Sequence, residues 1–275
     1  FGPEKHVIVS FKNAFHGRTL GAQLAGGMDH QKEWIVRTDA GFVQVPFPDG
    51  YKTEDRSFDR FEASLSELGI EPDQVAGVMS ESYQGVGPDF MPPEYAQKLR
   101  KWCSEHDVVL IMDEVQSGFG RTGRLFCFEH YGIVPDLICC GKGVSSSLPL
   151  SAVIGREEIM DQYAPGSMTS THSAHPFCCA AALANIEAML DDNLVEHAAE
   201  MEPVLKEGLS QIQSEYSDVI GCVQARGLVG GLQMAHPGTK EPNPDLAFEI
   251  NEKCFQKGLL MFAPVGPGGE CLKIS

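Results

Sequence analysis

The sequence predicts an α/β fold in which a mainly parallel sheet carries helices on its faces and part of a smaller α+β domain follows. Short apolar runs with the length of buried strands alternate with segments of helical periodicity, which is typical of parallel sheets. The chain of 275 residues, 43% of them hydrophobic, is long enough to bury one large core and part of a second. We therefore expect a large domain at residues 1–192 and a smaller, incomplete one at 193–275.

The expected elements follow one another along the chain. Apolar, β-branched runs predict strands at 6–11, 75–80, 108–112, 137–140 and 151–154. Helical periodicity predicts helices at 93–106, 177–190, 193–216 and 245–257. The segments 226–234 and 257–266 look like strands entered through glycine turns, and 39–64 is expected to be a long irregular connection.

Two polar side chains come directly after neighbouring predicted strands. Asp113 follows the run 108–112, and Lys142 follows the run 137–140 after one glycine. Their spacing suits a crossover between parallel strands, so both side chains should emerge at the carboxyl edge of one sheet, where α/β proteins bind ligands. A lysine and a carboxylate there suit pyridoxal phosphate (PLP), which needs a lysine for its covalent link and an acid beside its pyridinium nitrogen.

Five segments carry a family resemblance, in this order: FHGRTLGA (15–22), ESYQGVGP (81–88), DEVQSGFGRTG (113–123), PDLICCGKG (135–143) and STHSAHPFCCAAALA (170–184). Together they resemble the class III PLP-dependent aminotransferases, especially the 4-aminobutyrate and related ω-amino-acid aminotransferases. The resemblance implies the type I PLP-dependent transferase fold and transfer of an amino group from an amino donor to a 2-oxo acid. It also implies that the complete enzyme has further segments before and after this sequence, one of which binds the cofactor phosphate.

The resemblance assigns a role to each motif residue. Lys142 would hold the cofactor and move the substrate proton, while Asp113 would keep the pyridine nitrogen protonated, since a nearby opposite charge stabilises a cation. Gln116 would hydrogen-bond the ring hydroxyl. Phe15 would lie against the ring, and His16 would pack beside it. Purely structural roles, such as a loop carboxylate or a surface lysine, are the alternatives.

Three further residues complete the expected site. Glu81 would order the site from behind the cofactor-binding residues. Arg18 would bind a substrate carboxylate, because a guanidinium fork can hold both carboxylate oxygens, although a loop ion pair is its structural alternative. Thr171 would reach the cofactor phosphate of a neighbouring subunit, which implies a homodimer with shared active sites.

Two positions depart from the pattern of the 4-aminobutyrate enzymes. Val86 stands where those enzymes commonly have a second glutamate, and Lys273 is the best match to the arginine that this glutamate neutralises. A lysine cannot reproduce the planar guanidinium fork, so the sequence predicts that pyruvate rivals or exceeds 2-oxoglutarate as acceptor. A PLP-dependent racemase or aminomutase, an acetylornithine- or ornithine-type aminotransferase and a non-catalytic binding protein remain as alternatives.

Composition argues against other classes of protein. The net charge of −17 repels nucleic acid and anionic lipid, and no apolar stretch approaches the roughly 20 residues that span a bilayer. The nine cysteines lack paired C-x-x-C spacing, which favours buried free thiols in a soluble, cytoplasmic protein and no metal site.

One motif is misleading. Gly118, Gly120 and Gly123 match the dinucleotide fingerprint G-x-G-x-x-G. That fingerprint should follow its strand directly and precede an acid by about 20 residues, whereas here residues 113–117 intervene and the nearest later candidate, Asp136, comes too early. We therefore do not expect a dinucleotide site.

Overall fold

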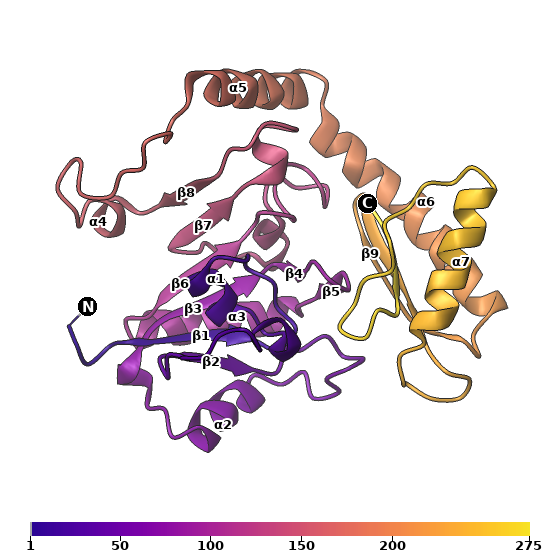
Figure 1. Cartoon of the computed structure of the whole chain (residues 1–275), viewed down its shortest axis with the longest axis horizontal. Coiled ribbons are helices and arrows are strands. Elements are labelled where there is room, and N and C mark those ends of the chain that lie inside the picture. Colours follow the sequence, from indigo (N-terminus) through magenta and orange to yellow (C-terminus); the bar gives the residue numbers. More distant parts are fainter. Residues whose placement is uncertain (1) are drawn as a thin grey trace.

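A six-stranded sheet organises the larger part of the molecule (Figure 1). The computed structural model describes residues 2–275. The strands of this sheet, in the order β2-β1-β3-β6-β7-β8, are β2 (Phe42–Val45), β1 (Val7–Phe11), β3 (Val75–Glu81), β6 (Val109–Asp113), β7 (Leu137–Cys140) and β8 (Ala152–Gly155). All neighbours are parallel except β8, which is antiparallel to β7. The predicted α/β fold with a mainly parallel sheet is confirmed.

Helix α3 (Pro93–Glu105) shows how the sequence covers this sheet. Pro93 stands at the first helical position, where its missing N–H costs no hydrogen bond. The buried side chains recur every three or four residues, at Tyr95, Leu99 and Trp102, so they form one apolar stripe. The helix ends before Asp107, whose φ of 52° cannot continue it. The stripe packs into the main core with β-strand residues that parallel sheets bury on both faces.

A second, three-stranded antiparallel sheet lies beside the first (Figure 1). It contains β9 (Ile220–Arg226), β10 (Val229–Met234) and β11 (Cys271–Ile274), with β10 in the middle. Long helices α5 (Pro176–Asp191) and α6 (Leu194–Glu215) lead into it, and α7 (Pro244–Gln256) packs on it. A separate apolar cluster that includes Leu209, Leu232 and Leu272 holds these elements together.

The remaining elements are short. They are α1 (Leu20–Ala25), α2 (Asp59–Glu67), α4 (Glu157–Met160), the hairpin of β4 (Tyr83–Gln84) and β5 (Asp89–Phe90), and the 3-10 turns η1 (Asp29–Gln31), η2 (Pro72–Gln74), η3 (Cys127–Tyr131) and η4 (Lys142–Val144). Helices α5 and α6 are separated by a turn at Asn193, where φ is 53°. We propose this turn as the boundary between the large and the small domain.

Three expectations were wrong or incomplete. The segment 257–266 is not a strand: Val265 makes only an isolated bridge to Cys271, and Leu260 is 80% exposed. An apolar run forms a strand only when a neighbouring strand pairs with it. Here β11 pairs with β10, so the segment 257–266 has no strand beside it. The region 39–64 holds β2 and the start of α2, so it is not wholly irregular, and β9 had not been expected.

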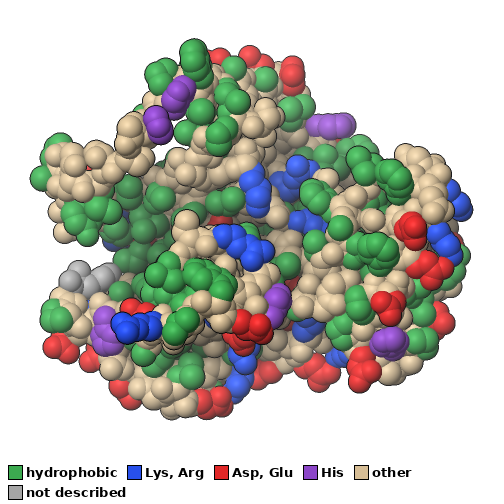
Figure 2. Space-filling model, viewed as in Figure 1, with side chains coloured by type: hydrophobic (Ala, Val, Ile, Leu, Met, Phe, Trp, Pro, Cys, Tyr) green, Lys and Arg blue, Asp and Glu red, His purple; other side chains and the backbone are tan. Residues whose placement is uncertain are grey.

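Apolar side chains remain uncovered on one side of the molecule. Strand β8 is exposed along its whole length, and Phe177 and Leu183 of α5 are 77% and 59% exposed. Figure 2 shows hydrophobic side chains at the top of the view, where α5 lies. The cysteines are free, as expected, but Cys179 on this helix is exposed, so the expectation that all are buried was wrong. In residues 2–275 no helix is both long and apolar enough to cross a membrane.

Candidate active site

Three predicted site residues meet at the carboxyl edge of the six-stranded sheet. Glu81, at the end of β3, pairs with Asp113, at the end of β6, and Asp113 pairs with Cys139 of β7. Lys142 follows β7 and begins η4. The parallel register therefore brings together side chains that are far apart in the sequence, as the strand ends predicted.

The backbone of Lys142 has an unusual conformation. Its φ of 40° lies in the left-handed region, which costs energy for a residue with a side chain and persists only where neighbours impose it. The side-chain amide of Asn185 on α5 donates a hydrogen bond of 2.8 Å to the Gly143 carbonyl and so holds this turn. The conformation presents the Lys142 side chain to a cavity.

The cavity has a volume of about 540 Å³, which is within the usual range for small-molecule sites. Six of the eight predicted site residues line it: Phe15, His16, Glu81, Asp113, Gln116 and Lys142. The other two do not. Arg18 is exposed, with its guanidinium carbon 5.4 Å from the centre of the Phe15 ring, and Thr171 lies in the exposed segment between α4 and α5. The roles of these two residues stay predictions.

Asp113 is held by two donors. The Nδ1 atom of His16 lies 2.8 Å from its Oδ2, and the N–H of Val115 donates to its Oδ1 at 3.0 Å. The His16 ring is fully buried, yet its Nε2 has no hydrogen-bond partner among residues 2–275. These contacts fix the direction of the Asp113 carboxylate, whereas the roles of Asp113 and His16 toward a cofactor stay predictions.

Glu81 connects two loops of the cavity wall. Its Oε2 accepts a hydrogen bond of 3.0 Å from the Phe15 N–H, and its Oε1 accepts one of 2.9 Å from the Gly85 N–H. Burial raises the pKa of Glu81 to about 7, with a smaller rise from nearby Asp113 opposed by His16. Glu81 thus lines the cavity and holds the loop that carries Phe15, and its expected role in ordering the site stays a prediction.

Gln116 and Lys273 form a second polar group in the cavity. The ammonium group of Lys273 donates to the side-chain oxygen of Gln116 and, at 2.8 Å, to the carbonyl of Gly85. Because the oxygen of Gln116 accepts from Lys273, its amide N–H groups remain as donors for a ligand. A Cβ on residue 85 would lie 2.7 Å from that oxygen, so a larger residue there would push the Gln116 side chain out of this position.

Sequence reasoning missed Glu114, the neighbour of Asp113. Its side chain is fully buried and accepts hydrogen bonds from the hydroxyls of Ser82 and Ser117 and from the N–H groups of Cys127 and Phe128. Burial raises the pKa of this carboxyl group. It anchors the loop that follows β6 and thereby the position of Asp113. The sequence offered one signal for Glu114, its position as a second acid in the DEVQS motif.

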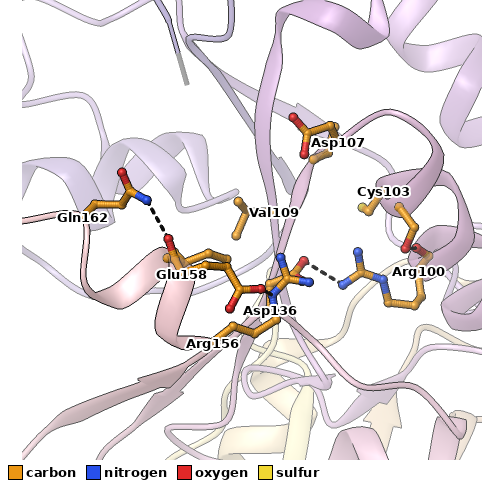
Figure 3. Close-up of a pocket in the computed structure, with 11 residues that line it drawn as sticks. Arg100, Cys103, Asp107, Val109, Asp136, Arg156, Glu158 and Gln162 are labelled. Atoms are coloured by element: carbon orange, nitrogen blue, oxygen red, sulfur yellow. Dashed lines mark hydrogen bonds and ion pairs between the residues drawn. The ribbon is translucent and has the colours of Figure 1, made fainter.

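A separate hollow of about 450 Å³ lies at the opposite, amino edge of the sheet (Figure 3). Asp136, directly before β7, is buried there between Arg100 and Arg156, at 2.7 and 3.3 Å, and accepts a hydrogen bond of 2.7 Å from the Leu110 N–H. These contacts tie α3 and the start of α4 to the sheet. Asp136 therefore has a structural role and lies at the wrong edge to serve a dinucleotide bound near Gly118.

The side chains that line the main cavity fit PLP. The Lys142 amine is available for an aldehyde, the oriented Asp113 carboxylate suits a pyridinium nitrogen, and the Phe15 ring can cover one face of an aromatic ligand. The free amide donors of Gln116 suit a ring hydroxyl. Among residues 2–275 no group of three or more His, Cys, Asp or Glu side chains is arranged to hold a metal ion.

Comparison with known proteins identifies the family of the chain. The chain belongs to the class III aminotransferases, whose family model matches residues 2–272. It is 35% identical to a 4-aminobutyrate aminotransferase of Mycobacterium leprae over 94% of its length and 34% identical to an alanine/serine racemase of Pyrococcus horikoshii over 100%. In both cases the match spans 60% of the relative. A crystal structure of a Bacillus anthracis aminotransferase superposes with a TM-score of 0.90 at 26% identity, covering 99% of this chain and 65% of that one.

Proposed function

We propose that this chain carries the catalytic core of a PLP-dependent aminotransferase that moves an amino group from an ω-amino acid, such as 4-aminobutyrate, to a 2-oxo acid. The observation that carries the proposal is the meeting of Lys142 and Asp113 in one cavity at the carboxyl edge of the sheet. The relatives named as 4-aminobutyrate and 5-aminovalerate aminotransferases support the choice of donor class.

Each cavity residue has a distinct task in such a reaction. When bound, PLP supplies an aromatic ring that withdraws electrons from the substrate carbon. The Lys142 amine would hold the cofactor through its aldehyde and, once the substrate amine has released it, would serve as the base that moves the substrate proton. Asp113, oriented by His16, would supply the negative charge that keeps the ring nitrogen protonated. Phe15, held by Glu81, would cover the ring face and exclude water from the reacting atoms.

We also propose a cytoplasmic homodimer. Apolar side chains of α5 and β8 are exposed in the single chain, and a second copy packed against them would cover them. In such a dimer Thr171 of one subunit would reach the cofactor phosphate of the other. The net charge of −17 argues against nucleic acid or a membrane surface as the partner.

The test uses the full-length protein loaded with PLP. Addition of 4-aminobutyrate should change the visible absorbance of the cofactor, and addition of a 2-oxo acid should restore it, because the amino group is stored and then released. The Lys142→Ala variant is the control and should show neither change. An unchanged spectrum with 4-aminobutyrate and with 5-aminovalerate would overturn the proposed donor class.

The racemase relative favours one second candidate, a PLP-dependent amino-acid racemase with the same lysine. Incubation with a single enantiomer of alanine or serine and no 2-oxo acid separates the two, because only an isomerase turns over under these conditions. Chiral chromatography of the product would show which reaction the protein performs.

A further inference from the structure

Asp89 lies where the three-stranded sheet meets the rest of the molecule. It belongs to β5, in the hairpin whose connecting loop lines the main cavity with Gly85 and Val86 (Figure 1). The residue is 2% exposed. Burial raises the pKa of Asp89 to about 6, against the effect of Lys52, so the carboxylate is ionised at neutral pH. A buried charge of this kind is stable only where several donors face it.

Three side chains donate hydrogen bonds to Asp89 from two sides. Lys52, in the loop that follows β2, lies 2.8 Å from its Oδ2. Gln224 of β9 and Gln233 of β10 each donate an amide N–H to its Oδ1 at 3.3 Å. Gln233 also donates to the carbonyl of Gly87 at 2.8 Å. The Asp89 carboxylate therefore joins a loop of the six-stranded sheet to two strands of the other sheet.

Lys52 extends the connection to the third strand. Its Nζ also lies 3.6 Å from an oxygen of Glu270, the residue before β11. The turn that carries Lys52 is held by Asp49, which accepts hydrogen bonds from the N–H groups of Lys52 and its two neighbours at 2.6, 2.7 and 3.1 Å. All three strands are thus connected to Asp89, either directly or through Lys52.

The three-stranded sheet supplies or supports part of the cavity wall. Lys273 reaches the cavity from β11. The turn between β9 and β10 holds Arg121, whose Nη1 donates a hydrogen bond of 3.2 Å to the Leu228 carbonyl, and Arg121 also lines the cavity. Lys142 and Asp113 instead belong to the six-stranded sheet and its turns. The position of the three-stranded sheet therefore shapes the binding space and leaves the lysine–aspartate pair in place.

We propose that Asp89 is a positioning residue of the active site: it fixes the three-stranded sheet against the hairpin of β4 and β5, and thereby the cavity wall that depends on this sheet. Asp89 itself does not line the cavity, so it acts through these contacts. The inference rests on the proposed aminotransferase function and names a residue that affects substrate binding rather than the reacting atoms.

Cys271 provides a reporter of the contact between the hairpin and the sheet. Its side chain and that of Pro88, in the hairpin loop, both lie against Gly231 of β10, where an added Cβ would be 2.9 Å from the Cys271 sulfur and 2.7 Å from Pro88 Cγ. Cys271 is fully buried there, as Cys103 of α3 is in the main core. Burial raises the pKa of both thiols to about 12. The two cysteines therefore differ in location and not in intrinsic reactivity.

The decisive variant is Asp89→Asn in the full-length, PLP-loaded protein. Asparagine has one acceptor oxygen and one NH2 group, so it must turn the NH2 group toward either Lys52 or the two glutamines. Asp136→Asn is the matched control, because Asp136 is also buried and ion-paired but is bound to Arg100 and Arg156 at the amino edge of the sheet. Melting temperature shows that each variant is folded.

The first readout is the rate at which a thiol reagent labels each cysteine, located by peptide mass. Asp89→Asn should label Cys271 ~10- to 100-fold faster than the unmodified protein, as expected when a charge-assisted hydrogen bond no longer opposes local opening. Cys103 in this variant, and Cys271 in Asp136→Asn, should stay within about threefold of normal. Cys271 labelling within about threefold of normal in Asp89→Asn, or an equal acceleration at Cys103, would overturn the proposal.

The second readout is the single-turnover absorbance change with 4-aminobutyrate. Asp89→Asn should raise the half-saturating concentration about 10-fold and change the rate at saturation less than about threefold, because the groups that react keep their positions. Asp136→Asn should change neither value beyond about threefold. A lower rate at saturation with an unchanged half-saturating concentration would contradict a role in substrate binding.

A second variant keeps the test valid if Asp89→Asn does not fold. Lys52→Met retains an apolar stem of similar length and removes one donor, so Cys271 labelling should rise at least about threefold, and an unchanged rate refutes the connection through Lys52. Failure here is distinct from failure of the proposed function. An unmodified protein without any absorbance change removes the proposed function, whereas thiol labelling needs no substrate and decides whether Asp89 holds the sheet.

Discussion

Replacement of Asp113 by asparagine is the most direct test of the proposed chemistry. The substitution removes one negative charge and preserves the shape of the side chain. His16 can adapt to the new amide by moving its proton to Nε2, which has no partner in the present structure, so its contact with residue 113 is kept. Residue 113 also keeps an oxygen for the Val115 N–H. We therefore expect the fold to survive and only the charge to be lost.

The expected loss of rate follows from that charge. An opposite charge within hydrogen-bonding distance shifts a pKa by about 1–3 units, and each unit corresponds to ~1.4 kcal/mol. If the pyridinium proton depends on Asp113, turnover should fall ~10- to 1000-fold.

The assay is the rate of the absorbance change with 4-aminobutyrate in the full-length protein under single-turnover conditions. Asp29→Asn serves as the control, because the Asp29 side chain is 95% exposed and does not line the cavity. Unmodified rates in Asp113→Asn, with cofactor bound, would exclude Asp113 from the chemistry and refute the reasoning.

The remaining predictions concern four other positions. Borohydride reduction followed by peptide mapping should place the cofactor label on Lys142, and a label on any other lysine contradicts its assignment. Because the pKa of Lys273 is lowered to about 8, the positive charge that it brings to the cavity is present below that pH and lost above it. The affinity for an unreactive dicarboxylate such as glutarate, measured by calorimetry, should therefore decline as the pH rises through 8, and Lys273→Arg should abolish this decline. Glu114→Gln should lower the free energy of unfolding by about 1–3 kcal/mol for each donor left unpaired, measured by urea denaturation, and an unchanged midpoint would show that the network contributes little. Phe177→Asp, at an exposed position of α5, should shift the full-length protein from dimer to monomer in light scattering, whereas a persistent dimer would place the interface elsewhere.

Much of the site could be predicted because it depends on local patterns. Asp113 and Lys142 come just after apolar runs of strand length, and parallel strands bring their carboxyl ends to one edge. Glu81, at the end of the adjacent strand, followed the same rule. The order of these elements and the chemistry of their terminal residues were therefore enough to predict the fold and the lysine–aspartate pair.

Other features depended on contacts between distant segments, which one sequence does not reveal. The segment 257–266 has the composition of a strand but lacks a neighbour to pair with. Lys273 could be compared with an arginine by position, yet its neighbours Gly85 and Gln116 became visible only when β11 was placed against the larger domain.

Arg121 and Glu114 show the same division within a single loop. Both lie in a motif that was recognised from the sequence, but the sequence did not reveal which way each side chain points. Glu114 turns inward because four donors converge on it, and Arg121 reaches the cavity because the Leu228 turn holds it there. Local residue order thus determined which elements form and where each ends, whereas packing between the two sheets decided which side chains share the cavity and what charge it presents.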